Sequence, residues 1–143
     1  MHGKPEQIAK AIALEILRLA IGQQRQCYII AFSGPGQIIE HTLEFNKAGL
    51  KGLIKFLQQS FFGGTDIPEP IIKALKIINE NKWNKADILL ISDARFPYPG
   101  EKLTRIETEC ERHNTCVQAI IIGPWSSKNL EKIASPVHRI ADI

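Results

Sequence analysis

Ile88-Leu89-Leu90-Ile91-Ser92-Asp93 is an apolar run that ends in a hydroxyl and a carboxylate. A run of large aliphatic residues is typical of a strand that is covered on both faces in a mostly parallel sheet. We expect this strand over residues 86–91, and the runs at 27–32 and 116–122 have the same character. A last strand is expected near 137–140. Together these runs predict the strands of a mostly parallel sheet.

The segments between the apolar runs have the spacing of amphipathic helices. Alternating apolar and polar side chains over Gln37–Phe45 instead predict a one-sided strand, antiparallel and at the edge of the sheet. Strands that alternate with helices favour a doubly wound α/β fold. We expect residues 1–143 to form a single domain of this class. The predicted helices cover residues 5–21, 50–57, 71–78, 103–110 and 129–134.

Two of these helices carry more specific signals. The apolar set of the helix over 5–21 is wide enough to predict packing on more than one side. Asp66 followed by Glu69 is a capping-box pattern, which predicts that Asp66 begins the helix over 71–78.

The composition excludes several classes of protein. The chain of 143 residues is 44% apolar, which suits one domain with a real core. It contains no run of roughly 18 apolar residues and no signal peptide, so we expect a soluble, cytoplasmic protein without a membrane partner. Lysine and arginine are scattered among acids, which gives no support for nucleic-acid binding. The three cysteines lie in apolar segments without paired spacing, so we interpret them as core thiols.

A candidate metal site lies where the predicted strands end. In open α/β sheets ligands bind beyond the carboxyl ends of the strands, where Ser33, Asp93 and the loop containing Thr65 are expected. Carboxylate and hydroxyl oxygens suit Mg²⁺, so Thr65 and Asp93 are candidate metal ligands. The alternative is that these side chains only cap helices and form turns, and residue chemistry alone favours that alternative.

The same edge offers candidate contacts for a protein partner. An aromatic side chain near a ligand-facing edge can anchor a partner, although it can equally fold back over the sheet. The sequence has no phosphate-binding loop, nucleophile elbow or H-E-x-x-H pair, so no catalytic residue is assigned. The candidate partner-binding residues are Ser33, Gly64, Asp66 and Trp125.

The chain resembles the von Willebrand factor A (VWA) fold, and more narrowly the bacterial VWA proteins of the ViaA type that work with MoxR-family AAA+ ATPases. The matching stretches are Cys27–Ser33, Leu53–Gln59 leading into Phe62-Gly63-Gly64-Thr65-Asp66, and Ile88–Asp93. The resemblance covers nearly the whole chain. It implies a non-enzymatic interaction module with such an ATPase as one partner.

The resemblance also implies that part of the domain is missing. The metal-ion-dependent adhesion site of VWA domains combines a D-x-S-x-S element after the first strand, a threonine and an aspartate, of which Thr65 and Asp93 match the last two. Met1-His2-Gly3-Lys4-Pro5 resembles the stretch that follows the first element. We therefore expect an N-terminally incomplete VWA-like domain without its first central strand. Mg²⁺ is expected in the complete domain, and this chain is not expected to bind it tightly.

A missing central strand would leave buried strand edges without partners on the strands at 27–32 and 86–91. Three outcomes are open: the two strands pair directly, a second copy supplies a strand and the protein becomes an oligomer, or the edges stay open. Two alternative functions also remain. One is a small hydrolase or phosphotransfer domain that uses Asp93, and the other is a structural fragment without independent activity.

Overall fold

The computed structural model describes residues 1–43, 46–60, 65–83, 85–95, 100–126 and 128–141. Strands and helices alternate over most of this length, as the sequence predicts, because aliphatic runs alternate with amphipathic segments. The elements are α1 (Lys4–Gly22), β1 (Cys27–Phe32), β2 (Ile38–Leu43), α2 (Lys47–Gln58), α3 (Pro68–Glu80), β3 (Ile88–Ser92), α4 (Gly100–His113), β4 (Val117–Ile122), the 3₁₀ helix η1 (Leu130–Lys132) and β5 (Val137–Ile140).

The described strands form two sheets rather than the one sheet expected. β3, β4 and β5 are parallel in the order β3-β4-β5, and Ile88 is aligned with Val117. β1 and β2 form an antiparallel hairpin in which Cys27 is opposite Leu43. The predicted antiparallel strand is therefore confirmed, and it begins and ends within the predicted range.

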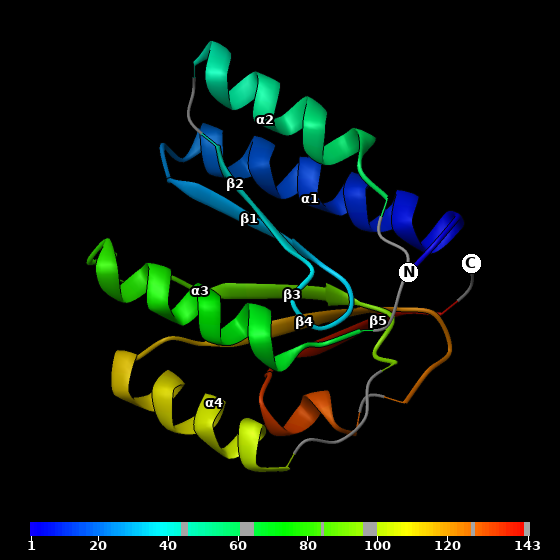
Figure 1. Cartoon of the computed structure of the whole chain (residues 1–143), viewed down its shortest axis with the longest axis vertical. Coiled ribbons are helices and arrows are strands. Elements are labelled where there is room, and N and C mark those ends of the chain that lie inside the picture. The colour runs from blue at the N-terminus through cyan, green and yellow to red at the C-terminus, as the bar shows by residue number, and fades with distance from the viewer. Residues whose placement is uncertain (44–45, 61–64, 84, 96–99, 127, 142–143) are drawn as a thin grey trace.

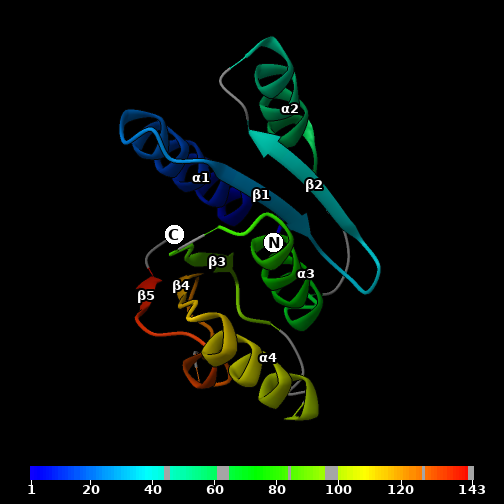
Figure 2. The ribbon, with the colours of Figure 1, turned by 90° about the vertical axis from the view of Figure 1, so that its left-hand side faces the viewer.

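The helices cover both faces of this arrangement. Figure 2 shows α1 and α2 on one side of the strands and α3 and α4 on the other. β1 and β3 point in the same direction, so their carboxyl ends lie at the same edge (Figure 1). None of the helices in the described part of the chain is long and apolar enough to cross a bilayer.

The buried aliphatic cluster lies between the three-stranded sheet and helices α3 and α4. Ile71 of α3, Ile106 of α4 and Ile121 of β4 are each at most 1% exposed. Burying such side chains removes about 25 cal/mol of unfavourable hydration per Å² of apolar surface. This cluster is the main buried apolar core of the described chain, and Leu90 anchors β3 to it.

Four local expectations are wrong. α1 does not bury a wide apolar set, because only Leu17 is buried on it. Strand β1 is not covered on both faces, since Ala31 is its one buried residue. Asp66 does not cap α3, whose N-cap is Ile67 without a side-chain hydrogen bond. Cys116 is exposed rather than a core thiol, because it precedes β4 instead of lying within the strand.

Candidate functional site

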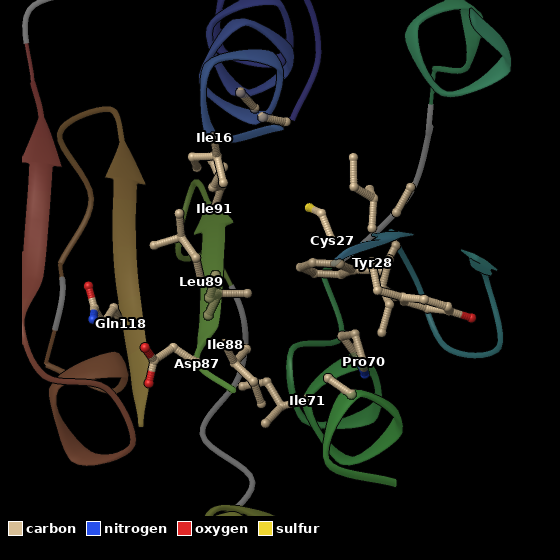
Figure 3. Close-up of a pocket in the computed structure, with 18 of the residues that line it drawn as sticks. Ile16, Cys27, Tyr28, Pro70, Ile71, Asp87, Ile88, Leu89, Ile91 and Gln118 are labelled. Carbon is tan, nitrogen blue, oxygen red and sulfur yellow. The ribbon is translucent and has the colours of Figure 1, made fainter. Parts of the chain in front are cut away.

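An inter-sheet cavity of about 900 Å³ separates β1 from β3. Every residue of both strands lines this cavity, and helices α1 and α3 line it as well. Figure 3 shows Cys27 and Tyr28 on one side of the space and Leu89 and Ile91 on the other. The partial exposure of β1 and of Leu89, which is 37% exposed, follows from this opening. The cavity is therefore a gap between two sheet edges.

On the edge of β1 that faces the cavity, the backbone groups pair with no strand in the described part of the chain. The Ser33 amide donates to the Gln37 carbonyl at 3.1 Å, which defines a hydrogen-bonded pair at the end of the hairpin. Bonded and non-bonded pairs alternate along an antiparallel ladder, so every second residue of β1 directs its peptide groups toward β2. The residues that direct theirs toward the cavity are Tyr28, Ile30 and Phe32.

The facing edge of β3 is open in the same way. The Ile88 amide donates to the Cys116 carbonyl at 2.9 Å, so Ile88 and every second residue after it are bonded to β4. Leu89 and Ile91 therefore direct their peptide groups toward the cavity. No described strand pairs with either edge, because β1 and β3 belong to different sheets. Direct pairing of these two strands, one of the three outcomes considered, is not what the structure shows.

Asp93 lies at the carboxyl end of β3, at one end of the cavity, and is 8% exposed. Its Oδ2 lies 3.6 Å from the amino group of Met1 and 3.9 Å from Nε of Arg95. Its Oδ1 accepts a long hydrogen bond, 3.4 Å, from the Arg95 amide. The buried carboxylate of Asp93 thus lies between the Met1 amino group and the Arg95 guanidinium.

Ser33 and Thr65 line the same cavity as Asp93. Ser33 is 6% exposed, and its hydroxyl donates to the side-chain oxygen of Gln37. The Ser33 carbonyl accepts from the Asp66 amide at 2.8 Å, which fixes the segment containing Thr65 beside the end of β1. The structure thus brings three predicted site residues to one end of the cavity.

The other predicted partner-binding residues lie elsewhere. Asp66 lines a separate, shallower pocket together with Glu69 and Lys102. Glu69 does not reach back to cap its helix, because its carboxylate accepts from the Gly36 amide at 3.0 Å. Gly64 lies outside the described residues. Asp66 therefore faces a different part of the surface from Asp93.

Trp125 is 43% exposed and is linked to Asp93 through a residue that the sequence reasoning missed. The guanidinium of Arg95 lies 3.9 Å from the centre of the Trp125 ring, in addition to its ion pair with Asp93. Arg139 donates to the Trp125 carbonyl at 2.5 Å. The sequence offers one signal for Arg95. It is a basic residue two positions after Asp93, the carboxylate at the end of the apolar run.

The described residues do not by themselves fit a Mg²⁺ site. Mg²⁺ requires near-octahedral oxygen coordination, and here one carboxylate and one hydroxyl are available from Asp93 and Thr65. The guanidinium of Arg95 also competes for the oxygens of Asp93. No group of three or more histidine, cysteine, aspartate or glutamate side chains suited to a metal occurs among the described residues. Further ligands would have to come from elsewhere.

The opposite end of the cavity combines apolar and charged lining residues, because Cys27 and Ile88 lie near Arg25, Lys82, Lys85 and Asp87. Burial raises the pKa of the Cys27 thiol, which keeps it protonated. At the margin of the cavity Lys10 donates to Glu6 at 2.6 Å. Burial acts to raise the pKa of Glu6, but hydrogen bonds from Lys10 and Ser60 outweigh it and hold that pKa below its ordinary value. The Lys10–Glu6 pair is thus part of the cavity lining.

Comparison with known proteins identifies relatives along almost the whole chain. It is 30% identical over 142 residues to the regulatory protein ViaA of Edwardsiella ictaluri (strain 93-146), which covers 97% of this chain and 28% of that protein. It is 29% identical over 140 residues to the regulatory protein ViaA of Proteus mirabilis (strain HI4320), with the same coverage of each chain. No protein-family model matches the sequence. The chain thus spans about 28% of the length of these curated relatives.

Proposed function

We propose that this chain is a non-enzymatic protein-interaction module of the VWA type, in which the central strand between β1 and β3 is not part of the chain. The observation that carries the proposal is the inter-sheet cavity, in which Ser33, Thr65 and Asp93 lie at the end where β1 and β3 terminate. The strand order β2-β1, then the cavity, then β3-β4-β5 supports it. So does the similarity to proteins named as regulatory rather than as enzymes.

The partner in this proposal is a protein, and specifically a MoxR-family AAA+ ATPase in the cytoplasm. The support is the exposed Trp125 with Arg95 stacked on it, next to a carboxylate, since aromatic and arginine side chains dominate the binding energy of many interfaces. Among the described residues Asp93 has no paired carboxylate, lysine or histidine, which does not favour the alternative of a hydrolase or phosphotransfer site.

In this proposal Mg²⁺ binds to the complete domain and not to this chain alone. Thr65 and Asp93 would supply two of its ligands, and the remaining ligands would come from outside this chain. For this chain alone, calorimetric titration with Mn²⁺ is expected to show no saturable binding tighter than about millimolar. Tighter binding that Asp93→Ala abolishes would show that the chain forms a metal site by itself.

The interaction role is tested by measuring the affinity of the chain for a MoxR-family ATPase of the same organism. Asp93→Ala and Trp125→Ala are expected to weaken binding at least about tenfold, which corresponds to about 1.4 kcal/mol for each residue. Asp87→Ala is the matched control, because Asp87 is an exposed aspartate at the opposite end of the cavity. Absence of binding, or equal effects of Asp93→Ala and Asp87→Ala, would contradict the proposal.

A further inference from the structure

We propose that the exposed face of helix α2 is a docking surface for an acidic amphipathic helix of a partner protein. This α2 face consists of three lysines and two aliphatic residues, all of them exposed: Lys47, Leu50, Lys51, Ile54 and Lys55. It is separate from the candidate site, because none of these residues lines the inter-sheet cavity.

The opposite face of α2 already packs against the hairpin. Gly49 is buried, and a side-chain carbon at Gly52 would lie 4.0 Å from the Thr42 carbonyl of β2. The rings of Phe56 and His41 meet edge-on, with their centroids 6.0 Å apart. These contacts hold the helix against β2 by the face opposite to its exposed aliphatic side chains. Those side chains are therefore available for a contact outside the chain.

The apolar part of the α2 face is a short ridge. Leu50 is 58% exposed, more than any other large hydrophobic side chain in the described part of the chain, and Ile54 is 46% exposed. Residues four apart are neighbours on the surface of a helix, so the two side chains stand together. Contiguous exposed apolar side chains with polar residues beside them are typical of interaction sites.

Two exposed aliphatic side chains of α1 add to this ridge. Lys10, Leu14 and Ile21 are separated by four and seven residues, which places them on one face of α1. The Lys10 ammonium donates to the carbonyls of Leu57 and Gln59, so this face of α1 is turned toward α2. Figures 1 and 2 show the two helices as neighbours. Leu14 and Ile21, both exposed, therefore lie on the side of α1 next to the α2 face.

The charge of the α2 face has one sign. Lys47, Lys51 and Lys55 repeat every four residues and follow the helix for about 12 Å. The sequence of α2 contains no aspartate or glutamate. Within the described residues, each lysine that forms an ion pair belongs to another helix. Carboxylates of a partner would thus meet lysines for which no described carboxylate competes.

An acidic amphipathic helix complements this combination of side chains. Its apolar residues, three and four positions apart, would pack against Leu50 and Ile54 as in other helix-recognition surfaces. Glutamates beside its apolar stripe would lie opposite the three lysines. Charge complementarity of this kind accelerates association and disfavours wrong partners.

Other occupants match the α2 face less well. A second copy of the chain would bring the same lysines against one another, and like charges repel. Amphipathic helices that bind membranes have a broad apolar face that includes aromatic residues. The single aromatic residue of α2 is Phe56, and it packs against His41 instead of lying on the exposed face.

The binding test uses a designed helical peptide of roughly 15 residues, with leucine at every third or fourth position and glutamate on both sides of that stripe. The control peptide keeps the leucines and has lysine in place of each glutamate. The acidic peptide is expected to bind at least about tenfold more tightly than the control, and more tightly at low salt than at high salt. Equal affinities, or no binding of the acidic peptide, would overturn the proposal.

Substitutions in the α2 face locate the bound peptide. Leu50→Gln and Lys51→Glu are each expected to weaken binding by about tenfold. Both side chains are exposed, so circular dichroism should show an unaltered fold. The matched controls are Leu19→Gln, at an exposed leucine that lines the inter-sheet cavity, and Lys102→Glu, at an exposed lysine of α4. Equal losses in the controls would place the peptide elsewhere and contradict the proposal.

Two further measurements distinguish the other occupants. Sedimentation with phosphatidylglycerol vesicles is expected to be the same for the unaltered chain, Leu50→Gln and Lys51→Glu. Vesicle binding that both substitutions abolish would assign the α2 face to a membrane and overturn the proposal. Light scattering is expected to show no self-association that depends on Leu50. A dimer that Leu50→Gln dissociates would assign the face to a second copy, with the same consequence.

Discussion

The guanidinium of Arg95 lies over the ring of Trp125, 3.9 Å from its centre. The same side chain places Nε 3.9 Å from Oδ2 of Asp93. One arginine thus connects a nearly buried carboxylate to an exposed aromatic side chain. A partner that carries a carboxylate to this edge would meet Arg95 and Trp125 together, and it could draw Arg95 away from Asp93.

Arg95→Ala is expected to change the local environment of Trp125 with little effect on folding. The Arg95 side chain is 59% exposed, so its ion pair and stacking contribute about 1 kcal/mol or less to stability. Trp125 fluorescence, measured in a Trp83→Phe background, should change, and Arg105→Ala on α4 should leave it unaltered. A loss of more than about 2 kcal/mol in chemical denaturation would mean that Arg95 has a structural role beyond these contacts.

Two neighbouring leucines of β3 should respond differently to truncation. Leu90 is 4% exposed and belongs to the buried cluster, so Leu90→Ala should lower the free energy of unfolding by about 2 to 4 kcal/mol. Leu89 is 37% exposed at the cavity, so Leu89→Ala should lower it by about 1 kcal/mol or less. Denaturant titration of both variants checks the prediction. Similar losses would imply that the cavity is closed in solution.

Lys10 should stabilise the junction between α1 and the end of α2. Its ammonium donates to the carbonyls of Leu57 and Gln59, at 2.8 and 2.5 Å, as well as to Glu6. Lys10→Met keeps the aliphatic stem but leaves these acceptors unpaired, which should reduce stability by about 1 to 3 kcal/mol. Lys51→Met, on the exposed side of α2, is the matched control in thermal unfolding. Equal effects would refute this role.

The Tyr28 phenol should lose its proton at an unusually high pH. Burial, together with the hydrogen bond to Glu40 and its negative charge, raises the pKa of Tyr28 to about 12. The folded-state pKa of Tyr28 is above the ordinary value of 10.0. The protonated Tyr28 therefore contributes its full stabilisation of the folded state below pH 10, and this contribution is lost as pH rises toward 12. Phenolate absorbance in a Tyr98→Phe background measures this pKa directly.

The contribution of Glu40 to that pKa can be separated. Glu40→Gln removes the negative charge, so the pKa of Tyr28 should fall toward 10.0 while burial holds it above that value. Lys73→Met is a useful comparison, because Lys73 pairs with Glu40 at 2.9 Å. If Glu40→Gln left the titration of Tyr28 unaltered, burial alone would account for the raised pKa.

The elements that the sequence predicts well are those whose signal is local. The aliphatic runs identify β3 and β4 as strands. The expected cover on both faces does not hold for β3, because Leu89 is exposed at the cavity. The alternation of apolar and polar residues along β2 likewise indicates that one face of this strand is covered. Ser33, Thr65 and Asp93 share one end of the cavity because strand ends gather at one edge of a parallel sheet.

The features that the sequence does not reveal depend on distant contacts. Glu69 follows Asp66 with capping-box spacing, yet it bonds to the Gly36 amide because the turn after β1 lies beside the start of α3. The stacking of Arg95 on Trp125 likewise joins two loops. Whether Thr65 and Asp93 bind a metal stays a prediction, as does the oligomeric state.

The gap between the two sheets also bears on how the molecule unfolds. The buried cluster lies in the part built from α3, β3, α4, β4 and β5, whereas the β1-β2 hairpin and its helices contribute few buried residues, among them Leu17, Ala31 and Leu43. Regions with fewer buried contacts open at lower free energy. The hairpin region should therefore exchange its amides and melt before the rest of the chain. Any contact that bridged the gap would merge two transitions into one, so the cooperativity of unfolding would report whether the inter-sheet cavity is filled.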